Sequence, residues 1–270
     1  MIWDPPSTLF TIPFLNHPIK IYGFLFALGF FIGYLLLSRS LGKAINDPPK
    51  GRLLTDRLVW FTIIGCIVGA RLGHVLFYDQ AFYFTYPHKI LYVWEGGLAS
   101  HGGTVGVFIA LLILWFRGKN DFKPLSFLQF FDLFIVPVAL VGMLIRLGNF
   151  FNQEVLGTPT NLPWGITFLH PADGLSTVPR HPVQLYEALL YFFIFASLSY
   201  LSTKKLRTGV ISGLFFISIF SGRFILEFWK SSQGGVFDDN IIQTGQLLSL
   251  PFILIGIFLV FKKPKTLQQS

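Results

Sequence analysis

The stretch FLQFFDLFIVPVALVGMLI, residues 127–145, leads directly into RLGNFFNQEVLG, residues 146–157. The first part has the length of a helix that crosses a hydrocarbon core, for which about 20 apolar residues are needed. The second part places an arginine, two asparagines and a glutamate within nine residues. A cation at the end of such a helix is costly unless it contacts water, a carboxylate or a lipid phosphate. The two parts together predict a membrane-spanning helix that ends in a polar site for an anionic group.

The rest of the chain has the same apolar character. Hydrophobic residues make up 53% of the sequence, charged residues only 13%, and Phe occurs 32 times. This composition excludes an ordinary soluble domain and predicts an all-α polytopic membrane protein. Seven apolar runs are predicted to span the membrane as helices: residues 21–37, 58–77, 98–116, 127–145, 183–201, 210–228 and 247–261. The sequence shows neither a repeat nor a linker, so we expect a single domain over residues 1–270.

Basic residues predict how the helices are oriented. Fourteen lie in one alternating set of loops and the C-terminal tail: Arg39, Lys43, Lys50, Arg52, Arg57, Arg117, Lys119, Lys123, Lys204, Lys205, Arg207, Lys262, Lys263 and Lys265. Only four lie in the other set: Lys20, Lys89, Arg180 and Lys230. Positive residues favour the cytoplasmic side, so the N-terminus is predicted outside and the C-terminus inside, with segment 146–182 as a small periplasmic cap. The charge is spread over short loops, and we therefore expect no nucleic-acid partner.

With this orientation, polar residues of all seven runs collect near the outer leaflet. They are Tyr22, Arg71, His74, Ser100, His101, Arg146, His181, Gln184, Tyr186, Glu187, Arg223, Glu227 and Gln246. Asp132 alone lies at an inner end. Helix ends are often polar, which would explain any single member of this layer. The inner ends, however, carry simple Lys and Arg flanks, whereas the outer ends carry amides, His, Tyr and potential ion pairs, which is typical of a functional site.

Two groups in this layer allow more than one interpretation. Arg223 and Glu227 are four residues apart and can pair on one helix face, either to neutralise each other or to serve catalysis. His101 is either a satisfied hydrogen-bonding residue or a base, because imidazole titrates near neutral pH. Gly102 and Gly103 follow it and allow close approach of a helix or a ligand.

Metal and thiol chemistry are not indicated. The six histidines lack the spacing of a metal site, so we expect no metal and no cofactor. Cys66 is the only cysteine and lies inside the second apolar run, where a buried, inert thiol is expected.

The motif R-x-G-N-F-x-N-x-E-x-x-G at residues 146–157 resembles the signature of bacterial prolipoprotein diacylglyceryl transferases. Similar matches run along the chain: YG at 22–23, WEGG at 94–97, HGG at 101–103, RHPxQLYE at 180–187, GRF at 222–224 with Glu227, and GQxLSxP at 245–251. One departure is Ile145, where the family usually has Gly; this affects the local helix geometry rather than the chemistry.

The resemblance implies an enzyme of the bacterial inner membrane that carries out the first step of lipoprotein maturation. It implies transfer of the diacylglyceryl group of phosphatidylglycerol to the lipobox cysteine thiol of a prolipoprotein, with release of glycerol phosphate. The implied partners are phosphatidylglycerol, prolipoprotein signal peptides bearing that cysteine, and membrane lipids. Because both substrates lie in the membrane, we expect a site at lipid level that opens sideways.

The residues suit this reaction. Charge collects on a phosphate as the donor's carbon–oxygen bond breaks, and arginine is the matching donor, so Arg146 and Arg223 are the candidates. His101 is the expected base for the thiol, with Glu227 and Tyr22 as alternatives or orienting groups. The remaining candidates are expected to bind the donor headgroup or shape the cap: Asn149, Asn152, Glu154, Gly157, Gln184, Tyr186 and Glu187. Lys230, just past the sixth run, is expected to matter little.

Two other classes of protein remain alternatives at this point. A transporter or channel also carries intramembrane charges, although it is expected to show repeats or interrupted spans near the midplane. A membrane scaffold explains the hydrophobicity but not the polar layer. Solute flux without a lipid product would favour the transporter.

Overall fold

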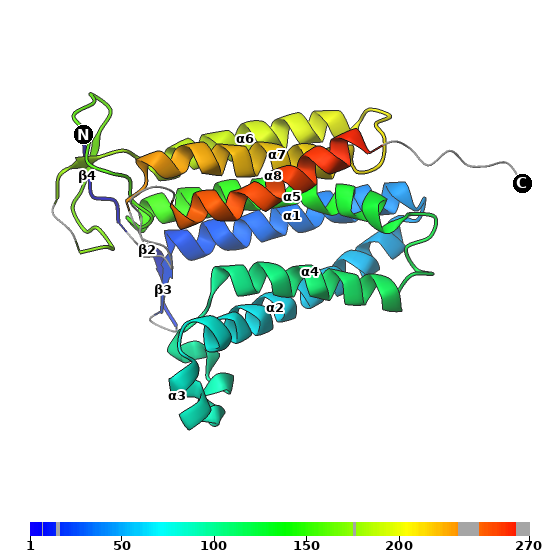
Figure 1. Ribbon diagram of the computed structural model, residues 1–270, viewed down its shortest axis with the longest axis horizontal. Helices are drawn as coiled ribbons and strands as arrows, with labels where there is room; N and C mark the ends of the chain where they lie inside the picture. Colours follow the sequence, from blue (N-terminus) through cyan, green and yellow to red (C-terminus); the bar gives the residue numbers. More distant parts are fainter. Residues whose placement is uncertain (7, 15–16, 175–176, 232–242, 263–270) are drawn as a thin grey trace, which may run out of the picture. The chain divides into compact units, whose positions relative to one another are not determined.

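The computed structural model describes residues 1–270 except 7, 15–16, 175–176, 232–242 and 263–270 (Figure 1). The chain forms two compact units. The first contains Met1–Leu36 and Phe131–Ser270, and the second contains Leu37–Phe130.

Every apolar run predicted to span the membrane is helical. The helices are α1 Ile21–Ala44, α2 Pro48–Phe77, α4 Ser100–Arg117, α5 Phe127–Phe151, α6 Val183–Ser202, α7 Val210–Leu226 and α8 Thr244–Phe261. Five of these segments are long and apolar enough to cross a membrane: α1, α2, α5, α6, and α7 together with the short turn that follows it. The apolar parts of α4 and α8 are shorter. The structure therefore confirms a polytopic, mostly helical membrane protein, while the count of seven spans stays a prediction.

Helix α2 begins earlier than its apolar run. The Asp47 side chain accepts a hydrogen bond from the Lys50 N–H at 3.0 Å, and Pro48 occupies the first turn. Both features stabilise a helix start, independently of hydrophobicity. Because α1 also continues to Ala44, most of the loop predicted at residues 38–57 is helical.

Helix α5 ends six residues later than predicted. The apolar run stops at residue 145, but the Asn152 N–H still donates to the Gly148 carbonyl at 2.9 Å. The chain leaves the helix where Gln153 adopts a φ of 53°, in the left-handed region. Arg146 therefore lies on the rigid last turns of a helix, and the predicted cap at 146–182 begins only after residue 151.

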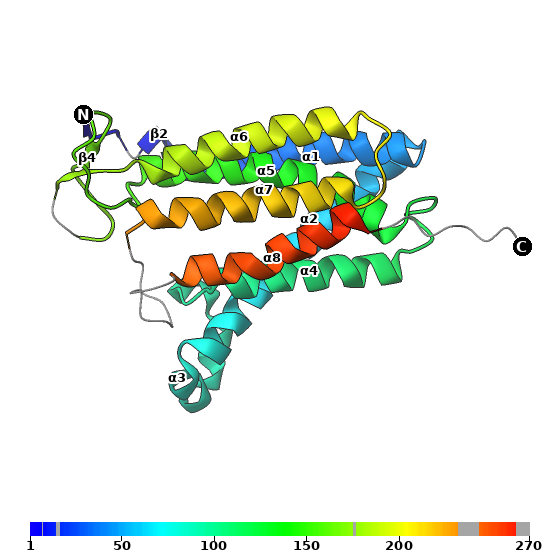
Figure 2. The ribbon, with the colours of Figure 1, turned by 45° about the horizontal axis from the view of Figure 1, so that its top comes forward.

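Helices α6, α7 and α8 of the first unit lie side by side (Figures 1 and 2). Gly213 of α7 and Gly256 of α8 face each other, and a Cβ on either would lie 2.8 Å from the other's carbonyl oxygen. Small residues at such contacts let helix backbones approach closely, which is how helices associate in lipid.

Asp132, the polar residue at the predicted inner end of α5, caps helix α7. Its carboxylate accepts hydrogen bonds from the Gly209 N–H at 2.6 Å, the Ser212 N–H at 2.9 Å and the Ser212 hydroxyl at 2.5 Å. These N–H groups have no partner within the helix, and an acidic residue also suits the positive end of the helix dipole. Asp132 thus fixes the start of α7 against α5.

The cap contains short strands that an all-α prediction misses. Strands β1 Ile2–Trp3, β4 Ile166–Phe168 and β5 Pro179–Arg180 form one sheet, with β1 parallel to β4 and β4 antiparallel to β5. Strands β2 Thr8–Ile12 and β3 His17–Lys20 form an antiparallel pair. The cap has its own apolar cluster of Phe150, Leu156, Ile166 and Phe168, against which Trp3 and Leu185 pack. The cap therefore includes the N-terminus of the chain.

In the second unit, α2 and α4 pack through glycines. Gly69 of α2 faces Gly106 of α4, where a Cβ on Gly106 would lie 2.8 Å from the Gly69 Cα. Gly102 likewise lies against Gly73. The close approach predicted at Gly102 is thus made by a helix. Cys66 is exposed rather than buried, because it lies beside this glycine face and not on it.

A compact loop connects the end of α2 to the start of α4. It consists of the short helices α3 Gln80–Thr85, η1 Pro87–Leu91 and η2 Val93–Glu95. Arg71 of α2 is buried beneath it and donates to five backbone carbonyls of residues 89–97. Its guanidinium carbon also lies 4.9 Å from the centre of the Tyr83 ring. Arg71 therefore holds the loop together.

Candidate active site

The site in the first unit begins with Arg146 on the last turns of α5. Its Nε lies 2.9 Å from Oε2 of Glu187, which is fully buried near the start of α6. Its Nη1 donates to Oδ1 of Asn149 at 3.1 Å, because residues three apart lie on the same helix face. The guanidinium is thus fixed by side chains of two helices.

Asn149 connects Arg146 to Glu154 in the cap. The Asn149 Nδ2 donates to Oε1 of Glu154 at 2.7 Å, and the Asn152 Nδ2 lies 3.4 Å from the same oxygen. The Gln184 side chain, also fully buried, donates to the Glu154 backbone carbonyl at 2.8 Å. The signature residues predicted to bind substrate therefore form one connected network with Arg146.

Tyr22 of α1 lies against the same part of α5. A Cβ at Gly148 would lie 2.6 Å from Cδ2 of the Tyr22 ring, so only glycine leaves room for this contact. Tyr22 is also within electrostatic reach of Arg146 and Glu154. The structure therefore brings Tyr22 to the network.

A second set of charges adjoins Glu187. The Lys230 Nζ lies 2.8 Å from Glu187 Oε1 and 3.4 Å from Glu227 Oε2. Lys230 is only 7% exposed. Lys230 was expected to matter little, yet it is buried within this cluster, because the chain turns back after the short helix η3 Glu227–Trp229 and directs this side chain inward. The sequence did contain one indication of this position, because Lys230 follows Glu227 by three residues, a spacing at which two side chains can pair.

Arg223 lies close to this charge cluster. It is within electrostatic reach of Tyr191, Glu187 and Glu227. Among the described residues, Glu227 forms its ion pair with Lys230, not with Arg223 as the four-residue spacing had suggested. Glu227 also touches the start of α8, where a Cβ at Gly245 would lie 2.5 Å from its carboxyl carbon. Arg223 itself forms a side-chain hydrogen bond with Tyr191 of α6.

The other predicted residues shape the surroundings. Gly157 lies so close to His181 and Val183 that a side chain would collide, and its carbonyl accepts from the Ser231 hydroxyl at 2.8 Å. The Tyr186 hydroxyl accepts from the Trp164 indole at 2.8 Å. Gln246 belongs to a capping box at the start of α8. These contacts explain the shape of the cap and of one helix end.

His101 lies in helix α4 of the second unit, and its side chain lies outside the described residues. Its role as a base stays a prediction.

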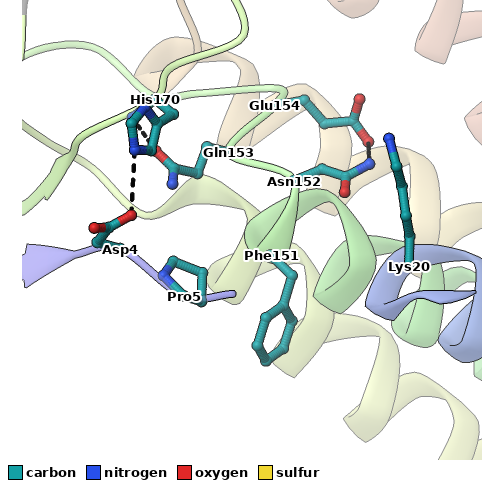
Figure 3. Close-up of a pocket in the computed structure, with 8 residues that line it drawn as sticks. All are labelled: Asp4, Pro5, Lys20, Phe151, Asn152, Gln153, Glu154 and His170. Atoms are coloured by element: carbon teal, nitrogen blue, oxygen red, sulfur yellow. Dashed lines mark hydrogen bonds and ion pairs between the residues drawn. The ribbon is translucent and has the colours of Figure 1, made fainter. Parts of the chain in front are cut away.

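A polar pocket of about 510 Å³ opens beside the network (Figure 3). It is lined by Asp4, Pro5, Lys20, Phe151, Asn152, Gln153, Glu154 and His170. Figure 3 shows the Lys20 side chain reaching toward Asn152 and Glu154, while Asp4 and His170 lie together on the other side of the view, 3.3 Å apart. The amides and the two carboxylates can bind hydroxyls, and the ammonium group of Lys20 can bind a phosphate.

The fold and the site together define a polytopic helical membrane protein with a polar, ion-paired network at the end of its helices. The family model for prolipoprotein diacylglyceryl transferase matches residues 7–262. The chain belongs to this family.

Curated relatives are similar to this chain over at least 90% of its length. The phosphatidylglycerol–prolipoprotein diacylglyceryl transferase of Tolumonas auensis is 44% identical, covering 90% of this chain and 91% of its own. Those of Porphyromonas gingivalis and Protochlamydia amoebophila are 40% and 35% identical, each covering 97% of this chain and 94% and 95% of their own. The transporter and scaffold alternatives therefore lose their support.

Proposed function

We propose that this protein transfers the diacylglyceryl group of phosphatidylglycerol to the cysteine thiol of a prolipoprotein, releasing glycerol phosphate. The observation that carries this is the family match over residues 7–262, which includes the signature at 146–157. In the structure, that signature forms the network around Arg146.

The donor's headgroup occupies the polar pocket in this proposal. Its phosphate lies next to Arg146, and Arg223 approaches when charge develops on the leaving group. Glu154 accepts hydrogen bonds from the glycerol hydroxyls, and the Asn152 amide both donates to them and accepts from them, because both residues line the pocket and belong to the Arg146 network. Gly157, Gln184, Tyr186 and Glu187 keep this arrangement in place.

The acceptor contributes the nucleophile. Its cysteine loses a proton, the sulfur attacks the glycerol carbon of the donor, and the bond from that carbon to the phosphate oxygen breaks. An ordinary thiol has a pKa of about 8.5, so modest help from a base is enough. His101, Glu227 and Tyr22 are the candidates for that base. The expected acceptor is a signal peptide with a lipobox cysteine.

The site faces the outer leaflet of the bacterial inner membrane in this proposal. All seven long helices span, with the N-terminus outside and the cap in the periplasm, over a single domain of residues 1–270. The support is the excess of basic residues on the opposite side. A cysteine introduced at Lys204 should be protected from impermeant labels added from the periplasm, whereas labelling there would overturn the orientation.

The reaction is tested with purified protein, phosphatidylglycerol and a lipobox peptide. We expect the peptide to gain the mass of a diacylglyceryl group and glycerol phosphate to appear in equal amount. A peptide with serine in place of cysteine is the matched control and should gain nothing. Release of glycerol phosphate without a lipidated peptide would contradict the proposal, because it would indicate a phospholipase.

A further inference from the structure

The backbone of Lys230 is fixed by pairing with another segment of the chain. It forms an antiparallel bridge with Gly157, the last residue of the signature. The flanking hydrogen bonds join the Thr158 N–H to the Trp229 carbonyl at 2.8 Å and the Ser231 N–H to the Leu156 carbonyl at 3.0 Å. The end of the signature therefore fixes where the Lys230 side chain starts.

The Lys230 ammonium bridges two carboxylates from different helices. It lies 2.8 Å from Glu187 of α6 and 3.4 Å from Glu227, which follows α7. Glu187 in turn lies 2.9 Å from Arg146. Lys230, Glu187 and Arg146 thus form a continuous row of alternating charges, in which Lys230 and Glu187 are buried and Arg146 is partly exposed.

Counting these charges shows what Lys230 adds. Arg146, Arg223, Glu187 and Glu227 together carry no net charge, and Lys230 brings these groups to a net charge of +1. Glu154, joined to Arg146 through Asn149, adds one more negative charge, so the six groups are neutral with Lys230 and net negative without it. In a buried site with weak screening, this difference decides whether an anion is attracted.

We propose that Lys230 is a positioning residue for the transfer reaction: it occupies Glu187 and Glu227 so that the two arginines can turn to the donor phosphate. This inference rests on the proposed function. Lys230 does not touch the reacting atoms. It acts through the carboxylates, and its removal leaves both of them competing for Arg146 and Arg223.

Steady-state kinetics of Lys230→Met in detergent or nanodiscs test this inference. We expect kcat/KM for phosphatidylglycerol to fall about 10- to 100-fold, with a raised KM, because phosphate binding itself is weakened. Simple loss of folded protein lowers the apparent kcat and leaves KM unchanged. Lys205→Met, at an exposed position between α6 and α7, is the control and should behave as the unmodified protein.

Two further variants make the test specific. Lys230→Arg retains a cation that can bridge both carboxylates and should stay within about 3-fold of the unmodified KM. Lys230→Met combined with Glu187→Gln removes the surplus negative charge and should bring KM back toward that of the unmodified protein. The inference is overturned if Lys230→Met leaves KM unchanged, or if the double variant is no better than the single one. If the unmodified protein forms no lipidated peptide, the proposed function itself fails.

Discussion

Arg71 and Arg146 are both buried or nearly buried arginines on apolar helices, but they have different kinds of partner. Arg71 donates to five backbone carbonyls of residues 89–97. Among the described residues, the polar contacts of Arg146 are with two side chains, the Glu187 carboxylate at 2.9 Å and the Asn149 amide oxygen at 3.1 Å.

This is the difference that we expect between an arginine that holds the fold together and one that binds a substrate. Backbone carbonyls cannot leave Arg71 unless the loop unfolds, so its contacts are part of the fold. Side chains can rotate, and Lys230 already shares the charge of Glu187. Arg146 can therefore exchange partners when a phosphate arrives, at little cost to the surrounding backbone.

The largest effect among the following variants is expected at Arg223. If it contacts the donor phosphate, Arg223→Lys keeps the charge but loses the planar fork, and kcat/KM should fall about 30- to 1000-fold. The peptide-lipidation assay measures this loss, and thermal unfolding checks that the protein is folded.

Nearby Glu227 offers a different explanation for the same loss. Replacing Arg223 and Glu227 together with glutamine removes both charges. Recovery of activity in this double variant would show that Arg223 only neutralises Glu227, and its contact with phosphate would then be withdrawn.

For Arg71 we expect a loss of stability instead. Arg71→Met leaves several carbonyls of residues 89–97 without a donor and should lower the free energy of unfolding by about 3 kcal/mol. Thermal unfolding in detergent and proteolysis within residues 86–97 measure the effect. A normal melting temperature with intact resistance to protease would mean that the loop does not depend on Arg71.

A smaller effect on stability is expected at Asp132. Asp132→Ala removes the cap of α7 and should cost about 1–2 kcal/mol. Asp132→Asn keeps one acceptor oxygen and should cost less. Equal losses in the two variants would indicate that the charge, not the cap, matters.

The smallest effect is expected at Cys66. The reacting thiol belongs to the acceptor, so Cys66→Ala should leave lipidation within about 2-fold of the unmodified enzyme, a barrier change of less than about 0.5 kcal/mol. Complete loss in a folded protein would point to a covalent enzyme intermediate.

Local patterns in the sequence predict much of this structure. The apolar runs became helices because hydrophobicity over membrane length leaves few other solutions. The network of Arg146, Asn149 and Glu154 follows from spacing within one signature. These features depend on residues that are close in the chain.

The sequence did not predict the features that depend on residues far apart in the chain. Strand β1 pairs with β4, more than 160 residues away in the chain, and no local pattern indicates that pairing. Lys230 was counted only as a loop charge, yet the bridge to Gly157 turns it inward. Helix ends such as Phe151 were misplaced because hydrogen bonding and capping, not hydrophobicity, set them.

The most direct test of the account compares Arg146→Lys with Arg71→Lys in one assay. Both variants keep the charge and lose the forked guanidinium. With rates expressed per folded protein, Arg146→Lys should lose about 30- to 1000-fold in kcat/KM while its melting temperature stays near that of the unmodified protein. Arg71→Lys should melt earlier but keep most of its activity per folded molecule. Equal losses of activity in both variants, or full activity of Arg146→Lys, would contradict the account.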